Sequence, residues 1–546
     1  MRNIFDKNHV LLLLLGALLF IPFNGGVHLF DWDEINFAES AREMIVTGNY
    51  LDVQINYEIF WEKPPLFIWM QVASMKIFGI NEFAARFPNA ICGIVTMLLL
   101  YAAGKRLQNS KFGLFWSLTY ITSLLPFFYF KSGIIDPWFN AFIFLSVWYI
   151  ILYSGKFKGN KLYFSFISAL FLGLAILTKG PVALLVFALV YLIQLIYFRF
   201  KTFFRIKDLL VFILTLVFIG GFWFILQIIS GNIGAVQDFI NYQIRLFSTQ
   251  DAGHGGFLFY HFVVLFFGVF PASVIALRAF IKKKDTPDAV RYVKTWLIVL
   301  FLVVLILFTI VKTKIIHYSS LCYFPLSFLA AMQLYRIAAD KDKIRLFEKI
   351  LLIFMGCIYA IGLAAFSNIE IIKTYLFKNH LIQDPFAIAN LQADAHWNGF
   401  EWLISLILLM GLVYFIANIG KQNKLKTLIV FGATLLVFHM GAMVLFVPRA
   451  EEYTQKAAIE YFKELPEDEC YVKTLGYKSY ADLFYFNKPV PINKLSSDAV
   501  WLLYGNIDKP VYFISKCTRK EQILNENRHL QVIGEKNGFV FYKREL

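Results

Sequence analysis

Residues 11–40 read LLLLLGALLFIPFNGGVHLFDWDEINFAES, an apolar run that is followed by the four carboxylates Asp31, Asp33, Glu34 and Glu39. The run is typical of a membrane helix, since about 20 apolar residues cross the ~30 Å hydrocarbon core. Carboxylates are costly inside hydrocarbon, and those that occur near it usually serve a function. The stretch therefore predicts a first membrane helix that is followed by an acidic loop.

The composition of the whole chain also indicates a membrane protein. Of its 546 residues, 59% are hydrophobic and 16% are charged, and the mean hydropathy is +0.61, well outside the range of water-soluble globular proteins. Apolar segments recur along the chain, and we predict a mainly α-helical protein with about 13 transmembrane helices. These segments are 9–29, 86–107, 113–130, 136–154, 162–178, 180–198, 209–229, 261–280, 295–311, 318–335, 349–366, 400–419 and 427–446.

Lys and Arg residues gather on one side of these alternating segments, for example at 105–106, 282–284 and 336–349. The positive-inside rule assigns that side to the cytoplasm. The formal net charge of +15 then reflects topology, and we expect no nucleic-acid partner. The loops 30–85 and 230–260 and the C-terminal tail fall on the opposite, outer side.

The outer loop 30–85 shows two helical patterns, FAESAREMI at 37–45 and PPLFIWMQVASMKIFG at 64–79. Pro64 and Pro65 suit a helix start. Because both patterns are amphipathic, we expect two short helices along the membrane surface.

The tail changes character after residue 447. No segment there is long enough to span a membrane, and a helical pattern at 450–465 is followed by the strand-like runs CYVKTLG, PVYFISK, LQVIGEK and GFVFYKR. These patterns predict a soluble α/β domain at 448–546 after a transmembrane domain at 1–447. Cys470 and Cys517 both lie in this tail, where a disulfide is permitted but not established by the sequence.

Several motifs occur together over about the first 335 residues. They are D-E-x-x-F-A-E at 33–39, A-R-E-M at 41–44, F-W-E-K-P-P at 60–65, F-G-x-N-E-F-A-A-R-F-P at 78–88, L-T-K-G-P-V at 177–182, D-A-G-H-G-G at 251–256 and K-T-K-I-I-H-Y at 312–318. In order and spacing this set resembles the GT-C class of integral-membrane glycosyltransferases. The resemblance is strongest to the branch that includes the lipid A aminoarabinose transferases and the protein O-mannosyltransferase-like enzymes of bacteria.

The resemblance implies an activity. Enzymes of this class transfer a sugar from a polyprenyl (undecaprenyl) phosphate donor to a hydroxyl or phosphate group of an acceptor, which here could be lipid A, another glycolipid or a protein. It also implies a multi-pass protein of the bacterial inner membrane, with membrane lipids around it and the active site and C-terminal domain on the periplasmic face.

Such a transfer needs a carboxylate that accepts the proton of the attacking hydroxyl. The resemblance places this catalytic group at Asp33, with Glu34 beside it as a supporting group. Capping of the first surface helix is the alternative reading of both residues. Asp31 lies outside the matched motif and is expected to be a solvated loop residue.

The transfer also needs cations, since negative charge grows on the phosphate leaving group. Lys63 is the leading candidate, because it stands at a predicted helix start that also favours an anion. Lys179 lies at an outer turn and suits a structural role as well as a substrate role. Further candidates for donor-phosphate binding are Arg245, Lys312, Lys314 and Tyr318.

Two residues form a candidate partial metal site. Related enzymes can hold a divalent cation between the carboxylate of the E-K-P motif and a loop histidine, which here are Glu62 and His254. The cation could be Zn, Mg or Mn, and a hydrogen-bonded loop histidine is the alternative reading.

The expected substrate pocket contains Asn36, Phe37, Phe60 and His317. Asn36 and Phe37 stand where the aminoarabinose branch commonly has Arg and Tyr, and Phe60 stands where it has Tyr. Because missing hydrogen-bonding groups weaken discrimination, we predict that the donor sugar, the acceptor or both differ from aminoarabinose and lipid A.

Other function classes fit the sequence less well. A polyprenyl-linked sugar flippase, a polymerase or a lipid transporter would share the many spans but would not require an outer carboxylate pair together with the F-W-E-K-P-P motif. A non-enzymatic scaffold gives no reason for either. The sequence shows no P-loop or dinucleotide fingerprint.

Overall fold

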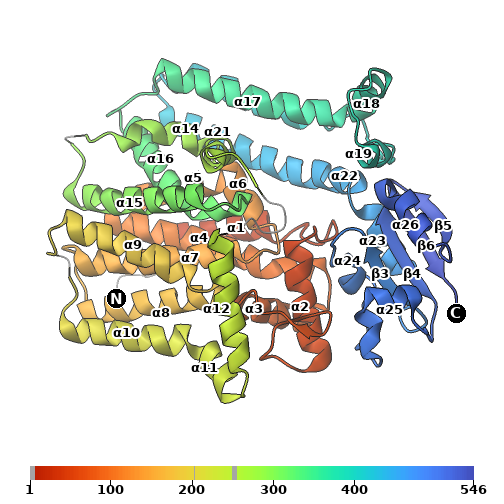
Figure 1. The fold of residues 1–546 in the computed structure, drawn as a ribbon. Helices are drawn as coiled ribbons and strands as arrows, with labels where there is room; N and C mark the ends of the chain where they lie inside the picture. The colour runs from red at the N-terminus through yellow and green to blue at the C-terminus, as the bar shows by residue number, and fades with distance from the viewer. Residues whose placement is uncertain (1–5, 202, 249–254, 284) are drawn as a thin grey trace.

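Helices dominate the computed structural model, which describes residues 6–201, 203–248, 255–283 and 285–546 (Figure 1). The longest helices run side by side. They are α4 (Glu82–Leu107), α7 (Asp136–Ser154), α8 (Lys161–Lys179), α15 (Asp288–Ile310), α16 (Tyr323–Ala338), α17 (Leu346–Ser367) and α21 (Lys424–Gly441). Most of these helices share one large apolar core, in which Trp296 and Phe328 are fully buried. Buried apolar residues of α17 and α21 belong to a second apolar cluster.

Seven helices of the described residues are long and apolar enough to cross a membrane, and two bent pairs raise this number to nine. One pair, α10 (Ile206–Gly220) and α11 (Phe222–Ile229), bends by 55°. The other joins α13 (Tyr260–Gly268) to the segment Ala272–Phe280 at 106°. The predicted number of about 13 spans is therefore not confirmed, although every predicted segment falls on a helix.

Several predicted spans form shorter helices than expected. They are α1 (Lys7–Phe20), α5 (Ser110–Ile121) with α6 (Leu124–Tyr129), α9 (Val182–Tyr197) and α20 (Leu403–Asn418). The first span was predicted at 9–29, and its predicted C-terminal end was wrong, because the helix stops at Phe20. Pro22 and the pair Gly25 and Gly26 follow directly, and such residues disfavour continuation of a helix.

The outer loop 30–85 forms the two predicted helices, α2 (Asp33–Thr47) and α3 (Leu66–Phe78), with a small hairpin of β1 (Gln54–Ile55) and β2 (Glu58–Ile59) between them. We call this segment the platform. In Figure 1 it lies between one end of the helical bundle and the C-terminal segment. All the site residues described below lie at this end.

The region 230–260, expected as a loop, contains the helix α12 (Ile233–Ser248). In Figure 1 this helix runs roughly at right angles to the long helices, across the end of the bundle. Its apolar residues include Ile233, Val236, Phe239, Ile240 and Ile244. These positions follow a helical period, which is typical of an amphipathic helix.

The C-terminal segment holds a four-stranded sheet in the order β3 (Tyr471–Leu475), β4 (Val511–Lys516), β6 (Phe539–Arg544) and β5 (Gln531–Lys536). The pair β3–β4 is parallel, and the other two pairs are antiparallel. Each of the four strand-like runs forms a strand. The helices of this segment are α22 (Val447–Glu452), α23 (Lys456–Glu464), α24 (Ala481–Phe484), α25 (Ala499–Tyr504) and α26 (Lys520–Glu526).

All five cysteines lie within the described residues, and each is a free thiol, Cys470 and Cys517 included.

Between α17 and α20 the chain forms the short helices α18 (Ile369–Lys378) and α19 (Pro385–Asn390).

The platform and the C-terminal segment share one apolar core. Ala38 and Met44 of α2 belong to the same buried cluster as Ile459 of α23 and Phe484 of α24. Burial of about 25 cal/mol per Å² of apolar surface favours this contact. The C-terminal segment is therefore packed on the platform and does not hang from a linker.

A buried ion pair anchors the start of α2. Arg86 of α4 binds both carboxylate oxygens of Glu34, at 3.0 and 2.8 Å. The same guanidinium donates to the carbonyl oxygens of Asn24, Val27 and His28, each at 2.8 Å. All five N–H groups of Arg86 are thus used, and they tie α2, the loop before it and α4 together.

We expect Arg86→Met to lower the free energy of unfolding by about 3–5 kcal/mol, because Glu34 would remain buried without its counter-charge. Thermal unfolding of the purified protein in lipid nanodiscs measures the change. Arg106→Met is the matched control on the same helix, since Arg106 donates to Lys158 at the exposed opposite end. Equal stability of the two variants would contradict the anchoring role.

Candidate active site

Asp33 is the first residue of α2, and its side chain is 46% exposed. The cap position belongs to Trp32, and no side chain makes a capping hydrogen bond there. The Asp33 carboxylate therefore does not cap the helix, although it lies in the first turn, where a negative charge is favourable. Its exposure leaves it accessible to a substrate.

Glu34 is placed differently from its neighbour. Its side chain is 7% exposed, pairs with Arg86 and accepts a hydrogen bond from the backbone N–H of Phe30. Burial alone would raise the pKa of Glu34, but the Arg86 guanidinium outweighs burial and lowers it below its usual range. Glu34 therefore carries a charge and fixes the helix start that presents Asp33.

His317 lies between two carboxylates. Its Nε2 is 3.6 Å from Oδ2 of Asp33 and 3.8 Å from Oδ2 of Asp136. His317 thus joins the platform to the start of α7, where Asp136 is the first residue. Protonation of the imidazole would pair it with either carboxylate.

Asp136 is a site residue that the sequence analysis did not single out. Its side chain is 4% exposed and binds Nζ of Lys179 at 2.7 Å. The available signal was Asp-Pro at 136–137 directly after an apolar run. Such a pair also marks an ordinary helix start, and only the neighbouring Lys179 and His317 distinguish Asp136 from one.

Lys179 reaches this site because of the turn that follows it. Lys179 is the last residue of α8, Gly180 has φ +91°, and α9 begins two residues later. A Cβ at Gly180 would lie 2.7 Å from Phe239 of α12, so both the backbone angle and the close approach favour glycine. The turn places the ammonium of Lys179 beside Asp136 and 5.2 Å from the ring centre of Tyr318.

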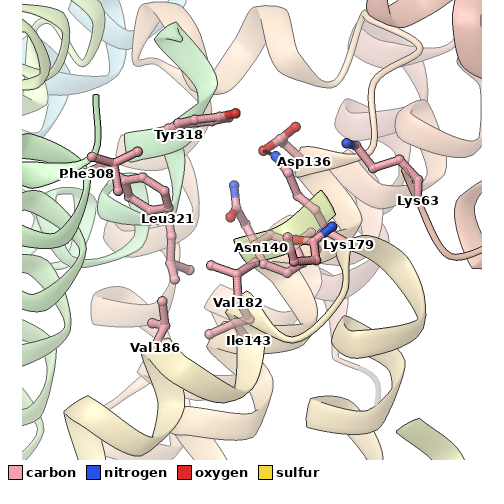
Figure 2. Close-up of a pocket in the computed structure, with 13 residues that line it drawn as sticks. Lys63, Asp136, Asn140, Ile143, Lys179, Val182, Val186, Phe308, Tyr318 and Leu321 are labelled. Atoms are coloured by element: carbon pink, nitrogen blue, oxygen red, sulfur yellow. Dashed lines mark hydrogen bonds and ion pairs between the residues drawn. The ribbon is translucent and has the colours of Figure 1, made fainter. Parts of the chain in front are cut away.

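Lys63 approaches from the platform. Figure 2 shows its ammonium pointing toward Asp136 from the side opposite Tyr318. Glu62 lies 4.0 Å from Nζ of Lys63 and accepts a hydrogen bond from the hydroxyl of Tyr242 at 2.8 Å. Burial lowers the pKa of Lys63 below that of a solvated lysine, and Lys179 adds to this, whereas Glu62, Asp33 and Asp136 oppose it.

Lys63, Asp136, Lys179 and Tyr318 line one pocket with a polar mouth and an apolar floor (Figure 2). The polar part consists of Lys63, Asp136, Asn140, Lys179, Gln243 and Tyr318. The apolar part consists of Phe139, Ile143, Val182, Val186, Phe308, Val311 and Leu321. The pocket measures ≈ 80 Å³, so a lipid-linked sugar would extend beyond it.

The other expected phosphate ligands lie in different positions. Arg245 is exposed on α12, 5.1 Å from the ring centre of Tyr242, and Lys312 is exposed. Lys314 is buried and donates to the carbonyl oxygens of Phe308, Thr309 and Val311. Its three N–H groups therefore stabilise the end of α15, and its part in phosphate binding stays a prediction.

Three residues that were predicted to line the substrate pocket are buried or pack against other side chains. Phe37 is 3% exposed and packs against Phe67 and Ile135. Asn36 is buried, and Phe60 packs against the core shared by the platform and the C-terminal segment. Their contact with a substrate stays a prediction.

The proposed metal pair is described only in part, since His254 lies outside the described residues. Glu62 is engaged by Tyr242 and Lys63, as given above. Among the described residues no group of three or more His, Cys, Asp or Glu side chains could hold a metal ion. One such carboxylate is not a metal site, and no step below is assigned to a metal.

Known proteins resemble this chain in sequence. Residues 62–224 match the family model described as dolichyl-phosphate-mannose-protein mannosyltransferase. The undecaprenyl phosphate-alpha-4-amino-4-deoxy-L-arabinose arabinosyl transferase of Pectobacterium carotovorum is 26% identical over 392 residues, 68% of this chain and 67% of the relative. In sequence the chain is therefore similar to the ArnT-like GT-C glycosyltransferases. Like these relatives, it is a multi-pass membrane protein.

The fold is similar to that of a solved structure. The crystal structure of ArnT from Cupriavidus metallidurans bound to undecaprenyl phosphate matches this chain with a TM-score of 0.72, covering 98% of this chain and 97% of ArnT at 16% identity. An uncharacterized protein of Aquifex aeolicus is 25% identical over 492 residues, 88% of this chain and 87% of the relative. The likeness therefore extends through the C-terminal segment.

Proposed function

We propose that this glycosyltransferase moves a sugar from a polyprenyl phosphate donor, of the undecaprenyl type, to a hydroxyl or phosphate group of an acceptor. The observation that carries the proposal is a charged cluster at the pocket that Lys63, Asp136 and Lys179 line. In it His317 lies 3.6 Å from Asp33 and 3.8 Å from Asp136, which binds Lys179. The named relative from Pectobacterium and the ligand of the Cupriavidus structure support the donor class.

In the proposed reaction Asp33 accepts the proton of the acceptor hydroxyl, because a neutral alcohol is a weak nucleophile. The oxygen attacks the anomeric carbon as the bond to the donor phosphate breaks, and direct displacement inverts that carbon. Lys63 and Lys179 stabilise the charge that grows on the leaving phosphate. Asp136 orients Lys179, and the apolar floor accepts the first part of the lipid.

The proposal also places the active-site end of the bundle on the periplasmic face of the bacterial inner membrane, with residues 448–546 as a periplasmic α/β domain after a transmembrane domain at 1–447. The basic clusters at the other end support this orientation. Lipid A, another glycolipid or a protein is the proposed acceptor. Glu62 and His254 stay candidates for a divalent cation, either Zn, Mg or Mn, and metal analysis of the purified protein tests them.

Reconstitution tests the activity. The purified protein in nanodiscs, an undecaprenyl phosphate-linked labelled sugar and a lipid extract of the bacterial envelope should yield a labelled lipid. Mass spectrometry of envelope lipids and glycoproteins from cells without the gene should show one missing sugar. Translocation of donor without transfer would instead indicate a flippase.

Donor profiling tests the specificity. We expect activity with undecaprenyl phosphate sugars other than aminoarabinose, because Asn36, Phe37 and Phe60 lack the hydrogen-bonding groups of the aminoarabinose branch. Initial rates with a panel of donors at equal concentration measure this preference. Strong and exclusive transfer of aminoarabinose to lipid A would refute it.

A further inference from the structure

His317 is a residue of the candidate active site to which the proposed reaction assigns no role. It lies in the 3-10 helix η2 (Ile316–Cys322), and its side chain is 14% exposed. Its Nε2 lies 3.6 Å from Oδ2 of Asp33 and 3.8 Å from Oδ2 of Asp136. The imidazole is therefore placed to act on either carboxylate.

The backbone of His317 is held in place by α7. The Ser320 hydroxyl donates to the carbonyl oxygen of His317, and Nδ2 of Asn140 donates to Oγ of Ser320 at 2.7 Å. Asn140 and Ser320 are buried, and Asn140 lies one turn after Asp136 on α7 (Figure 2). Because buried hydrogen bonds are costly to break, His317 is fixed to the same helix that carries Asp136.

Asp136 has a closer partner than His317. Nζ of Lys179 donates to Oδ1 of Asp136 at 2.7 Å, whereas the imidazole lies 3.8 Å from Oδ2. The negative charge of Asp136 is thus compensated without His317. Since Nε2 carries at most one hydrogen, its N–H is available to Asp33.

The Asp33 carboxylate has one candidate anchor in the described part of the chain. Of the Lys, Arg and His side chains there, only that of His317 lies within 4.0 Å of it. The carboxylate is 46% exposed, and no side chain makes a capping hydrogen bond at the start of α2. A general base works only when it is held within reach of the proton that it takes, so a group that fixes this carboxylate favours transfer.

We propose that His317 is a positioning residue for the proposed base: the N–H of Nε2 donates to Oδ2 of Asp33 and leaves Oδ1 free to take the acceptor proton. The inference rests on the proposed function. A separation of 3.6 Å is longer than a hydrogen bond, but catalytic hydrogen bonds are often long before substrate binds and shorten in the complex. His317 takes up no proton in this role, because the neutral ring with its hydrogen on Nε2 donates as the imidazolium does.

The contact between His317 and Asp33 is tested without turnover, by nuclear magnetic resonance of the full chain in nanodiscs with isotope-labelled histidine. The ring resonances of His317 are assigned by their loss in His317→Gln. Asp33→Asn should shift them, because it removes a neighbouring charge. Asp288→Asn, at a residue of α15 that is 96% exposed, should leave them unchanged. Unchanged His317 resonances in Asp33→Asn would overturn the inference, whether or not the protein transfers a sugar.

The role itself is tested by initial rates of transfer. In His317→Met, which has a similar volume but no donor, kcat should fall about 10- to 100-fold, the value of one hydrogen bond to a charged group. The KM values of donor and acceptor should stay unchanged. His317→Gln should recover most of the loss, because its amide N–H can donate to the same oxygen. His396→Met is the matched control, since His396 lies 3.3 Å from Asp394 but is 83% exposed, and its rate should equal that of the unmodified protein.

A double variant separates positioning from other roles. If His317 acts through Asp33, His317→Met should lower the rate less than about twofold further in the Asp33→Asn protein. A full additional loss in the double variant, a raised KM with normal kcat, or an equal loss in His317→Gln, as expected of a ring that carries the proton, would overturn the inference and leave the proposed reaction standing. A normal rate in Asp33→Asn together with shifted His317 resonances would remove the proposed base, and this role with it.

Discussion

Asp33→Asn should reduce sugar transfer by about 10²–10⁴-fold, the usual contribution of a positioned general base. The amide has nearly the same size as the carboxylate but cannot accept the acceptor proton. Because Asp33 is half exposed and takes no part in the Glu34–Arg86 anchor, the variant should fold normally. Initial rates in nanodiscs, with undecaprenyl phosphate binding measured in parallel, test this.

The matched control is Asp288→Asn. Asp288 is also the first residue of a helix, α15, and its side chain is 96% exposed, so its transfer rate should equal that of the unmodified protein. A normal rate in Asp33→Asn would remove the proposed base. A loss of donor binding equal to the loss of rate would assign Asp33 to binding and not to proton transfer.

Lys63→Met should lower kcat/KM for the donor by about 10²–10³-fold, the effect of removing one group that stabilises developing negative charge in a transition state. Lys63→Arg should recover part of the loss, because it keeps the charge but changes the geometry. Lys156→Met, at an exposed site on the α7–α8 loop, is the control. Full activity of Lys63→Met would contradict the phosphate assignment.

The pH dependence gives an independent test of the same residue. The charged ammonium binds phosphate, and burial lowers the pKa of Lys63. As the pH rises, donor affinity should therefore begin to fall before the pH reaches ~10.4, the pKa of a solvated lysine. In Lys63→Arg this decline should disappear, because a guanidinium stays protonated throughout the range. Affinity titrations of undecaprenyl phosphate from neutral to alkaline pH measure it.

Local sequence patterns predicted much of the fold. The apolar runs fall on helices, and the two surface helices of the platform lie where their periodicity indicated. The four strand-like runs near the C-terminus form one sheet. Each of these predictions depends on a periodic pattern within a short segment, and such patterns are visible in a single sequence.

The features that the sequence did not reveal depend on contacts between distant residues. Asp136 looked like an ordinary helix start until Lys179 and His317, from two other elements, were found beside it. The hairpin at 54–59 is held by Lys488, more than 400 residues later in the chain, which accepts from Tyr57 and donates to Asn56. The bends at 220–222 and 268–272 interrupt segments whose hydropathy is continuous. Hydropathy therefore predicted straight spans where the structure has bent helix pairs.

A structure of the full chain in nanodiscs with bound undecaprenyl phosphate, determined by electron cryo-microscopy, measures the central arrangement directly. The phosphate should lie within ~4 Å of the ammonium groups of Lys63 and Lys179, a distance at which ion pairs form. The carboxylate of Asp33 should face the same pocket from the opposite side of the phosphate. A phosphate bound elsewhere, or an Asp33 side chain that points away from it, would contradict the proposed sugar transfer.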